Sequence, residues 1–325
     1  MNWTKFTKQQ LKKIKAQCFI DYGRSYRDTI LLVGSGRSGT TWLSDVINYN
    51  ENYRYIFEPF HNQKVHACRK FVAQTYIRPK DPSPHNHQLF QKVLSGRVRS
   101  NWSDRFNEKI LSHQRLIKSI RVNLLLKWLT LYFPGMPVVY LMRHPFAVAV
   151  SRMKYGGWRT KGLDKYLSQP ELMDDFLEPF RREMKLAKRK YQATGDVFDN
   201  HIFSWCIQNY IPLRQCSAND FHIVFYEDCC VEPACEISRL FNYLKKKPKE
   251  NILNGLSKAS RVSRRDSAIV TGNSLIEGWK NSLSIKQIER GLEILNLFGL
   301  DAIYSEDLMP RAEGLSNFVQ TSVVC

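Results

Sequence analysis

Short apolar runs alternate with longer stretches of helical spacing along most of the chain. Short runs rich in Val, Ile, Leu and Tyr are typical of buried strands, whereas apolar residues at intervals of three and four indicate helices. The expected strands are residues 29–33, 53–57, 116–120, 137–142 and 222–226. The expected helices are residues 40–49, 122–132, the segment after Pro145 that carries Ser151, 171–192, 235–244 and 285–298. Strands that alternate with helices predict an α/β fold, in which a central parallel sheet is flanked by helices.

One large domain over residues 28–310 accounts for this alternation. Residues 1–27 are basic, with apolar positions at helical spacing, and fit either a helix packed on the domain or one lying on an anionic membrane. Residues 62–114 are polar, with Pro and His concentrated around 79–87, and we expect them to form an insertion of helices and a loop. Residues 311–325 are expected to form a flexible tail.

The composition is that of a soluble globular protein, apart from its charge. Of 325 residues, 43% are hydrophobic and 24% charged, and the net charge is +19. This charge favours anionic partners (a polyphosphorylated nucleotide, an acidic glycan, nucleic acid or an acidic membrane) over a merely basic surface. The eight cysteines form no C-x-x-C pair, so we expect free thiols and no zinc site. No apolar run approaches the ~20 residues of a membrane span and no secretory signal is present, so we expect a cytoplasmic location.

A glycine-rich loop, Gly34-Ser35-Gly36-Arg37-Ser38-Gly39, lies between the first expected strand and the helix that follows it. The loop fits the G-x-G-x-x-G pattern of dinucleotide-binding folds, and Glu58 stands about 20 residues on, where those folds keep a ribose-binding acid. The same stretch is also a degenerate P-loop, because Gly34 and Gly39 have the right spacing and Thr40-Thr41 replace Lys-Ser/Thr. In both cases backbone amides and a helix N-terminus bind a phosphate.

Side chains in and after the loop favour the P-loop-like alternative. Arg37 adds a guanidinium that can bind phosphate oxygens, and Ser38, Thr40 and Thr41 add hydroxyl donors. The lysine with which ATP and GTP sites neutralise phosphates is missing, which argues against a kinase-like site. We therefore expect a P-loop-like three-layer fold whose loop binds a phosphate or a similar anion.

A second anion site is indicated after the fourth expected strand. Arg143 comes just past the end of that strand, and Ser151 follows on the next helix. Because ligands of open α/β sheets bind beyond the carboxyl ends of the strands, both side chains should converge near the glycine-rich loop. A ligand with a further phosphate on its ribose 3′-position fits this arrangement, whereas NAD has no phosphate there. Taken alone, Arg143 also fits a surface ion pair.

With both motifs in view, the chain resembles the sulfotransferases that use 3′-phosphoadenosine-5′-phosphosulfate (PAPS), and within them the carbohydrate sulfotransferases. The segments that carry the resemblance are residues 37–42, 55–60, 116–121, 143–152, 226–228 and 273–280. The resemblance implies donor contacts from Arg37, Ser38, Gly39, Thr40, Thr41, Trp42, Arg143, Ser151, Tyr226 and Ser267. The first segment would bind the 5′-phosphosulfate, the fourth the 3′-phosphate, and Tyr226 would lie near the adenine. The chain departs from some relatives at Gly278, which replaces a basic residue, and residues 62–114 match nothing recognisable.

The implied chemistry is in-line transfer of a sulfuryl group to a hydroxyl, without a metal and with 3′,5′-ADP as the product. Glu58 is the expected general base, with His61 as the alternate. Lys118 and Arg37 would stabilise charge on the transferred group and the leaving phosphate. A contribution from Ser267 or Arg265 in the late loop is a further expectation.

The acceptor is expected on a carbohydrate or glycolipid, chosen by residues 62–114. Three alternatives stay open: a protein-tyrosine or small-molecule acceptor, a dinucleotide-dependent oxidoreductase, and a basic polyanion-binding module that is not an enzyme. Nucleic acid is not an expected partner, and contact with an anionic membrane would involve residues 1–27.

Overall fold

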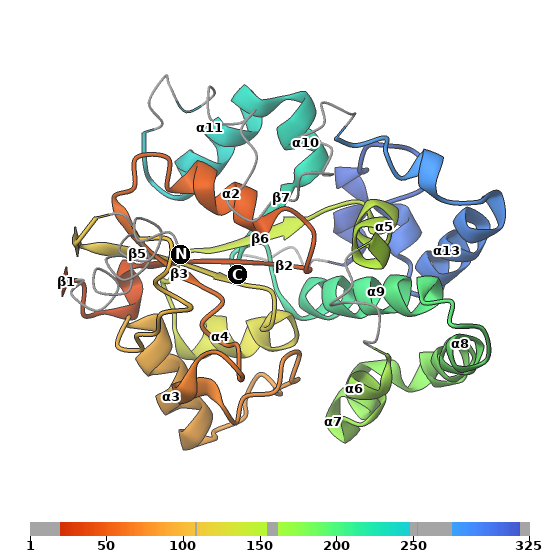
Figure 1. Cartoon of the computed structure of the whole chain (residues 1–325), viewed down its shortest axis with the longest axis horizontal. Coiled ribbons are helices and arrows are strands. Elements are labelled where there is room, and N and C mark those ends of the chain that lie inside the picture. The colour runs from red at the N-terminus through yellow and green to blue at the C-terminus, as the bar shows by residue number, and fades with distance from the viewer. Residues whose placement is uncertain (1–19, 108, 155–161, 248–251, 253–274, 319–325) are drawn as a thin grey trace, which may run out of the picture.

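The computed structural model describes residues 20–107, 109–154, 162–247, 252 and 275–318. Its centre is a five-stranded parallel sheet in the order β3-β5-β2-β6-β7 (Figure 1). The strands are β2 (Thr29–Gly34), β3 (Tyr53–Phe57), β5 (Gln114–Ser119), β6 (Val138–Met142) and β7 (His222–Phe225). All five predicted strands and their parallel arrangement are thus confirmed. A small parallel pair, β1 (Ile20–Asp21) with β4 (Leu111–Ser112), was not predicted, since its two-residue strands carry no periodic signal.

Helices cover both faces of the sheet, which gives the predicted three layers. One face carries α2 (Thr40–Ile47), α10 (Tyr226–Val231) and α11 (Pro233–Tyr243), and the other carries α3 (Pro84–Leu94), α4 (Leu126–Tyr132) and α9 (Phe198–Gln215) (Figure 1). Successive side chains of a strand point to opposite faces. Ile30 and Leu32 accordingly pack with the first layer, whereas Leu31 and Val33 pack with the second.

The remaining helices lie beside this core or at its ends. They are α5 (Pro145–Lys154), α6 (Asp164–Leu167), α7 (Pro170–Leu172), α8 (Arg181–Thr194) and α13 (Ile285–Leu297), together with short 3-10 turns at Tyr26–Asp28, His66–Cys68, Asn123–Leu125, Glu178–Phe180, Lys280–Ser282, Leu300–Ala302 and Ala312–Asn317. The helices predicted to start near residues 40, 122, 145, 235 and 285 are confirmed, although their first or last residues differ from the prediction. Among the described residues, none of the helices combines the length and apolar character that a membrane span requires.

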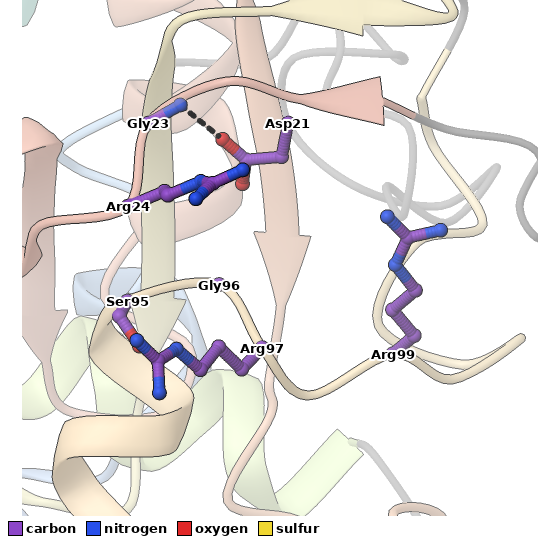
Figure 2. A pocket seen from close by; sticks show the side chains of 7 residues that line it. All are labelled: Asp21, Gly23, Arg24, Ser95, Gly96, Arg97 and Arg99. Atoms are coloured by element: carbon purple, nitrogen blue, oxygen red, sulfur yellow. Dashed lines mark hydrogen bonds between the residues drawn. The ribbon is translucent and has the colours of Figure 1, made fainter.

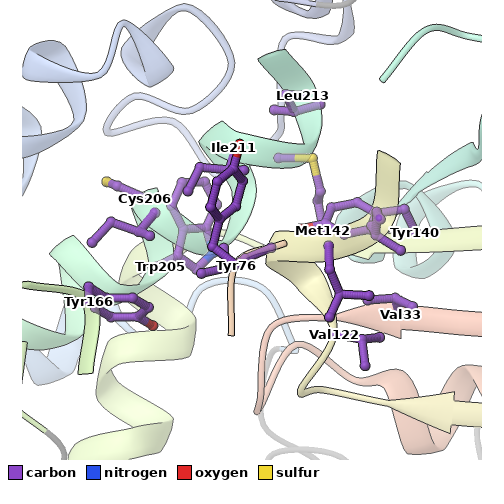
Figure 3. Close-up of a cluster of buried hydrophobic side chains, with 14 of the residues drawn as sticks. Val33, Tyr76, Val122, Tyr140, Met142, Tyr166, Trp205, Cys206, Ile211 and Leu213 are labelled. Atoms are coloured by element: carbon purple, nitrogen blue, oxygen red, sulfur yellow. The ribbon is translucent and has the colours of Figure 1, made fainter. Parts of the chain in front are cut away.

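Helix α9 was missed by the sequence prediction, although it is the longest helix that the structure describes. It is almost wholly buried, and polar residues such as Asn200, Gln208 and Asn209 are buried with the apolar ones. A helix enclosed on all sides shows no apolar stripe, so its sequence lacks the amphipathic period. Figure 3 shows its Trp205 and Cys206 within the same apolar cluster as strand residues of the sheet.

Two predicted segments differ in detail. Helix α3 starts at Pro84, inside the expected loop at 79–87, because Ser83 caps its first turn and proline is tolerated at the first helical position. The continuous helix expected over 171–192 is broken by a π-helical turn at Met173–Leu177 and a 3-10 turn that contains Pro179. Proline removes a helical hydrogen bond, which accounts for the break.

Several expectations fall at or beyond the edges of the described residues. Residues 1–19, Arg265 and Ser267 lie outside them. Residues 312–317, within the expected tail, form a 3-10 turn, and Phe318 after it is buried against the core.

Candidate active site

The strand order places a ligand crevice between β2 and β6. The chain leaves β2 toward β3 on one side of the sheet, and it leaves β6 toward β7 on the other. The connection after β2 uses α2 on one face, whereas the connection after β6 uses α9 on the opposite face (Figure 1). Such a topological switch point opens a crevice beyond the carboxyl ends of the two strands. The glycine-rich loop and Arg143 follow those two ends.

The glycine-rich loop has the backbone of an anion cradle. Arg37 and Gly39 have φ angles of 78° and 100°, in the left-handed region. Turns of this kind bring successive amides to one concave side, and here they lead into the N-terminus of α2. Ser38 closes the turn, since its amide and its hydroxyl both donate to the carbonyl of Ser35, at 3.1 and 2.6 Å. A Cβ at Gly39 would lie 2.8 Å from the Tyr226 ring, so this position needs glycine for packing as well.

The structure brings the two predicted anion motifs into contact. Arg37 Nε donates a hydrogen bond of 3.0 Å to the hydroxyl of Ser151 on α5. Arg143 approaches the same loop, and its Nη1 lies 3.5 Å from the carbonyl of Arg37. The side chains that the sequence analysis assigned to two phosphates therefore form one group, which carries two cations.

An aromatic wall, formed by Tyr226 and Trp42, adjoins this group of side chains. The guanidinium of Arg143 lies 4.1 Å from the centre of the Tyr226 ring, and Trp42 packs edge-on against that ring at 5.5 Å. Arg143 Nη2 donates to the carbonyl of Leu275 at 3.0 Å. Its Nε is buried and has no hydrogen-bond partner among the described residues. A buried donor of this kind is costly unless a ligand satisfies it, so Arg143 fits an anionic guest.

A buried arginine that the sequence did not single out supports the loop from beneath. Arg152 is enclosed and donates from Nε to the carbonyl of Gly36 at 3.1 Å. Its other nitrogens reach the carbonyl of His201 and the side chain of Gln208 on α9. Burial lowers the pKa of Arg152 to about 10, which leaves it cationic at neutral pH. Arg152 stands next to Ser151 in the sequence, but its contacts with the loop and α9 appear only in the fold.

Glu58 begins a second group of charges, at the carboxyl end of β3. Its backbone has a φ of 47°, a left-handed conformation that is uncommon outside glycine and concentrated at functional sites. Lys118 Nζ donates to its carboxylate at 2.6 Å, and Arg121 pairs with the other oxygen. Burial raises the pKa of Glu58, but the two cations outweigh burial, and the net pKa lies below the usual range. Glu58 is therefore a buried, ionised carboxylate.

Lys118 links the two groups. Burial lowers its pKa, and although Glu58 opposes this effect, the cations Arg121 and Arg37 lower the pKa further. In the sheet, Lys118 lies opposite Phe57 of β3 and Leu32 of β2, so its strand stands between the Glu58 group and the glycine-rich loop. The predicted residues Arg37, Glu58 and Lys118 are thus brought together by three different strand ends.

Beside Glu58 lies a shelf of aromatic and basic side chains, formed by His61, Trp102 and Arg105. The Trp102 ring packs edge-on against His61 at 5.3 Å, and the Arg105 guanidinium lies 3.9 Å from its centre. The shelf is fixed to the edge of the sheet, because the Phe57 amide donates to the carbonyl of Ser103 at 2.8 Å. Trp102 and Arg105 belong to the segment 62–114, whose sequence matched no known pattern.

The strand order argues against the dinucleotide alternative. Dinucleotide-binding sheets place the second strand of the motif next to the first. Here β5 separates β3 from β2, and Glu58 is paired with Lys118 and Arg121. Its position as a ribose ligand beside the loop is therefore excluded by the topology. Among the described residues, no three His, Cys, Asp or Glu side chains group as metal ligands.

Comparisons with known proteins show what this chain is similar to. The family model described as "Sulfotransferase domain" matches residues 27–294. The sulfotransferase domain from the curacin biosynthetic pathway is 14% identical, over 82% of this chain and 95% of that chain, with a TM-score of 0.45. A mouse sulfotransferase complexed with PAP is 16% identical, over 90% and 89%, with a TM-score of 0.40. Retinol dehydratase in complex with androsterone and the inactive cofactor PAP is 16% identical, over 86% and 82%, with a TM-score of 0.40. A search of curated protein sequences found no match.

Proposed function

Because this chain belongs to the sulfotransferase-domain family, we propose that it transfers a sulfuryl group from PAPS to an acceptor hydroxyl. The observation that carries this proposal is the hydrogen bond between Arg37 and Ser151, which joins two anion-binding motifs at the switch point of the sheet. PAPS has a phosphosulfate at its 5′ end and a phosphate on its 3′ oxygen, so it presents an anion to each motif.

The proposed donor-binding roles are supported by the positions of these residues. The amides of the 35–39 loop, with Arg37 and the α2 N-terminus behind it, would hold the 5′-phosphosulfate. Arg143 and Ser151 would hold the 3′-phosphate, and Ser38, Thr40 and Thr41 would line the approach. The wall formed by Trp42 and Tyr226 suits a flat adenine ring. Ser267 remains a further proposed contact.

For the transfer step, Glu58 is the proposed general base. As the acceptor oxygen bonds to sulfur, the bond from sulfur to the 5′-phosphate oxygen breaks, and the acceptor proton passes to a Glu58 carboxylate oxygen. Lys118 and Arg37 would stabilise the negative charge that gathers on the leaving phosphate. No residue need change its oxidation state, and the products are a sulfate ester and 3′,5′-ADP.

The ion pairs of Glu58 determine how strong a base it is. While Lys118 and Arg121 both pair with it, the carboxylate is a weak proton acceptor, because its pKa is lowered. An anionic donor beside Lys118 would compete for that cation. We propose that donor binding draws Lys118 toward the phosphosulfate and so raises the proton affinity of Glu58.

A carbohydrate or glycolipid acceptor is supported by the shelf beside Glu58. Sugars present hydroxyls together with apolar ring faces, and Trp102 offers a matching amphipathic surface. Its indole N–H is buried and has no hydrogen-bond partner among the described residues. The experiment that tests the acceptor class is transfer of label from sulfur-labelled PAPS to a panel of glycans, glycolipids, tyrosine peptides and phenols. Label on peptides or phenols alone would overturn the carbohydrate proposal and keep the sulfotransferase one.

Trp102→Ala is expected to raise the KM for the acceptor roughly three- to tenfold, the range that an aromatic contact contributes. The KM for PAPS should stay unchanged, because Trp102 lies on the Glu58 side and away from the donor loop. Steady-state kinetics with each substrate varied in turn checks this, with the melting temperature as a control on folding. An equal rise in both KM values would contradict a role in acceptor binding.

Arg152→Gln is expected to weaken 3′,5′-ADP roughly tenfold, because one charge-assisted hydrogen bond to the loop is lost. Arg152 does not touch the proposed ligand, so it acts as a positioning residue. Arg152→Lys keeps the buried charge and should recover part of the affinity. Calorimetric titration measures both variants; a variant that lowers the melting temperature but binds 3′,5′-ADP normally would show a purely structural role.

A further inference from the structure

A surface hollow of about 430 Å³, drawn in Figure 2, lies at the amino end of the sheet. It is lined by Asp21, Gly23, Arg24, Ser95, Gly96, Arg97 and Arg99. The hydroxyl of Thr29, the first residue of β2, donates to Leu94 beside this hollow, whereas the loop follows the last residue of the same strand. At about 3.3 Å per residue, the two places lie roughly 20 Å apart.

Two buried arginines form the frame behind the hollow. Arg54 donates to the carbonyls of Gly96 and Val98, at 2.5 and 3.3 Å. Arg115 donates to the carbonyl of Gly23 at 2.5 Å and also to that of Ser25. The backbone segments on both sides of the hollow are therefore fixed by charge-assisted hydrogen bonds from the sheet.

Asp21 is the acidic residue of the lining, and the frame neutralises it. Its two carboxylate oxygens pair with Arg115 at 2.9 Å and with Arg54 at 3.1 Å. Gly96 passes close above this pair with a φ of 71°, and a Cβ there would lie 2.5 Å from Asp21 Oδ2. The floor is thus tightly packed, and its carboxylate is already occupied by cations.

The rim, in contrast, carries excess positive charge. Arg24 follows β1, and Arg97 and Arg99 follow α3, and all three are exposed (Figure 2). Within the described part of the chain, the guanidiniums of Arg24 and Arg97 have no ion pair, since every salt bridge there involves other side chains. The frame fixes the backbone beside Arg24 and Arg97, and guanidinium groups bind tetrahedral oxyanions through paired hydrogen bonds.

We propose that this hollow is a second anion site, which takes a sulfate or phosphate group independently of the donor crevice. Arg24 and Arg97 are its principal ligands. The same group could come from a free inorganic anion or from a sulfated glycan. The site does not depend on the proposed reaction, because none of its residues belongs to the donor or acceptor machinery.

The test is a calorimetric titration of the full chain with inorganic sulfate, inorganic phosphate and a sulfated oligosaccharide. Three proteins are compared: wild type, the double variant Arg24→Ala with Arg97→Ala, and a control double variant, Arg182→Ala with Arg189→Ala. The control removes the same charge from exposed positions on α8, on another part of the molecule (Figure 1). All three proteins keep the glycine-rich loop, so anion binding there is common to them.

The rim variant is expected to lose roughly tenfold or more in affinity for at least one probe, while the control changes less than twofold. If the rim variant loses affinity for the inorganic anions, the site takes a free oxyanion. If it loses affinity for the oligosaccharide alone, the site takes a sulfated glycan. Equal loss in both double variants would reduce the effect to general surface charge and overturn the proposal. Unchanged affinity for all probes in the rim variant would overturn it as well. Melting temperatures check that both variants are folded.

Discussion

Glu58→Gln is expected to reduce turnover roughly 10²–10⁴-fold, the usual contribution of a general base. Affinity for 3′,5′-ADP should stay nearly intact, because the proposed donor contacts are the loop and Arg143. Glutamine keeps the shape of the side chain and can still accept a hydrogen bond from Lys118, so the buried cation keeps a partner. Single-turnover rates at saturating PAPS, with calorimetry of 3′,5′-ADP, measure the two quantities separately.

The controls for Glu58 follow from its burial. Removing one partner of a buried ion pair costs stability, about 3–5 kcal/mol in other proteins, so the melting temperature must be followed. If affinity for 3′,5′-ADP collapses and turnover per bound donor does not, Glu58 is a donor ligand and not a base. Glu58→Asp, which shortens the side chain but keeps the carboxylate, should retain part of the activity.

The lowered pKa of Glu58 also sets the direction of a pH effect. A carboxylate whose pKa is lowered in the folded protein contributes stability above its unfolded pKa of about 4.3 and loses that contribution as pH falls. The Glu58 contribution should therefore be present at neutral pH and vanish in acid. Denaturant unfolding of wild type and Glu58→Gln between neutral and acid pH would check this, since the difference in stability should shrink below about pH 4.

Arg143→Ala is expected to weaken 3′,5′-ADP roughly 10–100-fold, the range of a lost charge-assisted contact. Adenosine 5′-phosphosulfate lacks the 3′-phosphate, so its affinity should fall much less. The Arg143 side chain also packs on Tyr226, and loss of that contact would weaken both ligands by the same factor. The ratio of the two losses in affinity therefore measures the contribution of the 3′-phosphate contact alone.

Competition binding with the two nucleotides gives this ratio directly. Arg143→Lys is the matched comparison, because it keeps the charge and loses the planar fork that binds two oxygens at once. It should fall between wild type and Arg143→Ala for 3′,5′-ADP. Equal losses for the two nucleotides in Arg143→Ala would remove the 3′-phosphate assignment.

The sheet, and the position of the two proposed anion motifs at its edge, were predictable from the sequence for a local reason. Buried parallel strands appear as short continuous apolar runs, and their carboxyl ends share one edge of the sheet. The loop at 34–39, Glu58 and Arg143 each follow such a run. Their placement at one edge of the sheet therefore required only that the strands be parallel, which the structure confirms.

What the sequence did not reveal depends on contacts between distant segments. The strand order, which removes Glu58 from the dinucleotide position, has no local signal, because either order gives the same runs. The pairing of Glu58 with Arg121, the support of the loop by Arg152, and the shelf at Trp102 each join residues from separate elements. Helix α9 escaped prediction because full burial removes the periodic contrast on which prediction depends.

The central claim is that the crevice binds one ligand through two anionic groups of that ligand. Calorimetric titration with 3′,5′-ADP, 5′-AMP, adenosine 3′-phosphate and NADH tests this claim most directly. We predict that 3′,5′-ADP binds most tightly and that removal of either phosphate weakens binding by roughly tenfold or more. Tighter binding of NADH, or equal binding of 5′-AMP and 3′,5′-ADP, would contradict the claim.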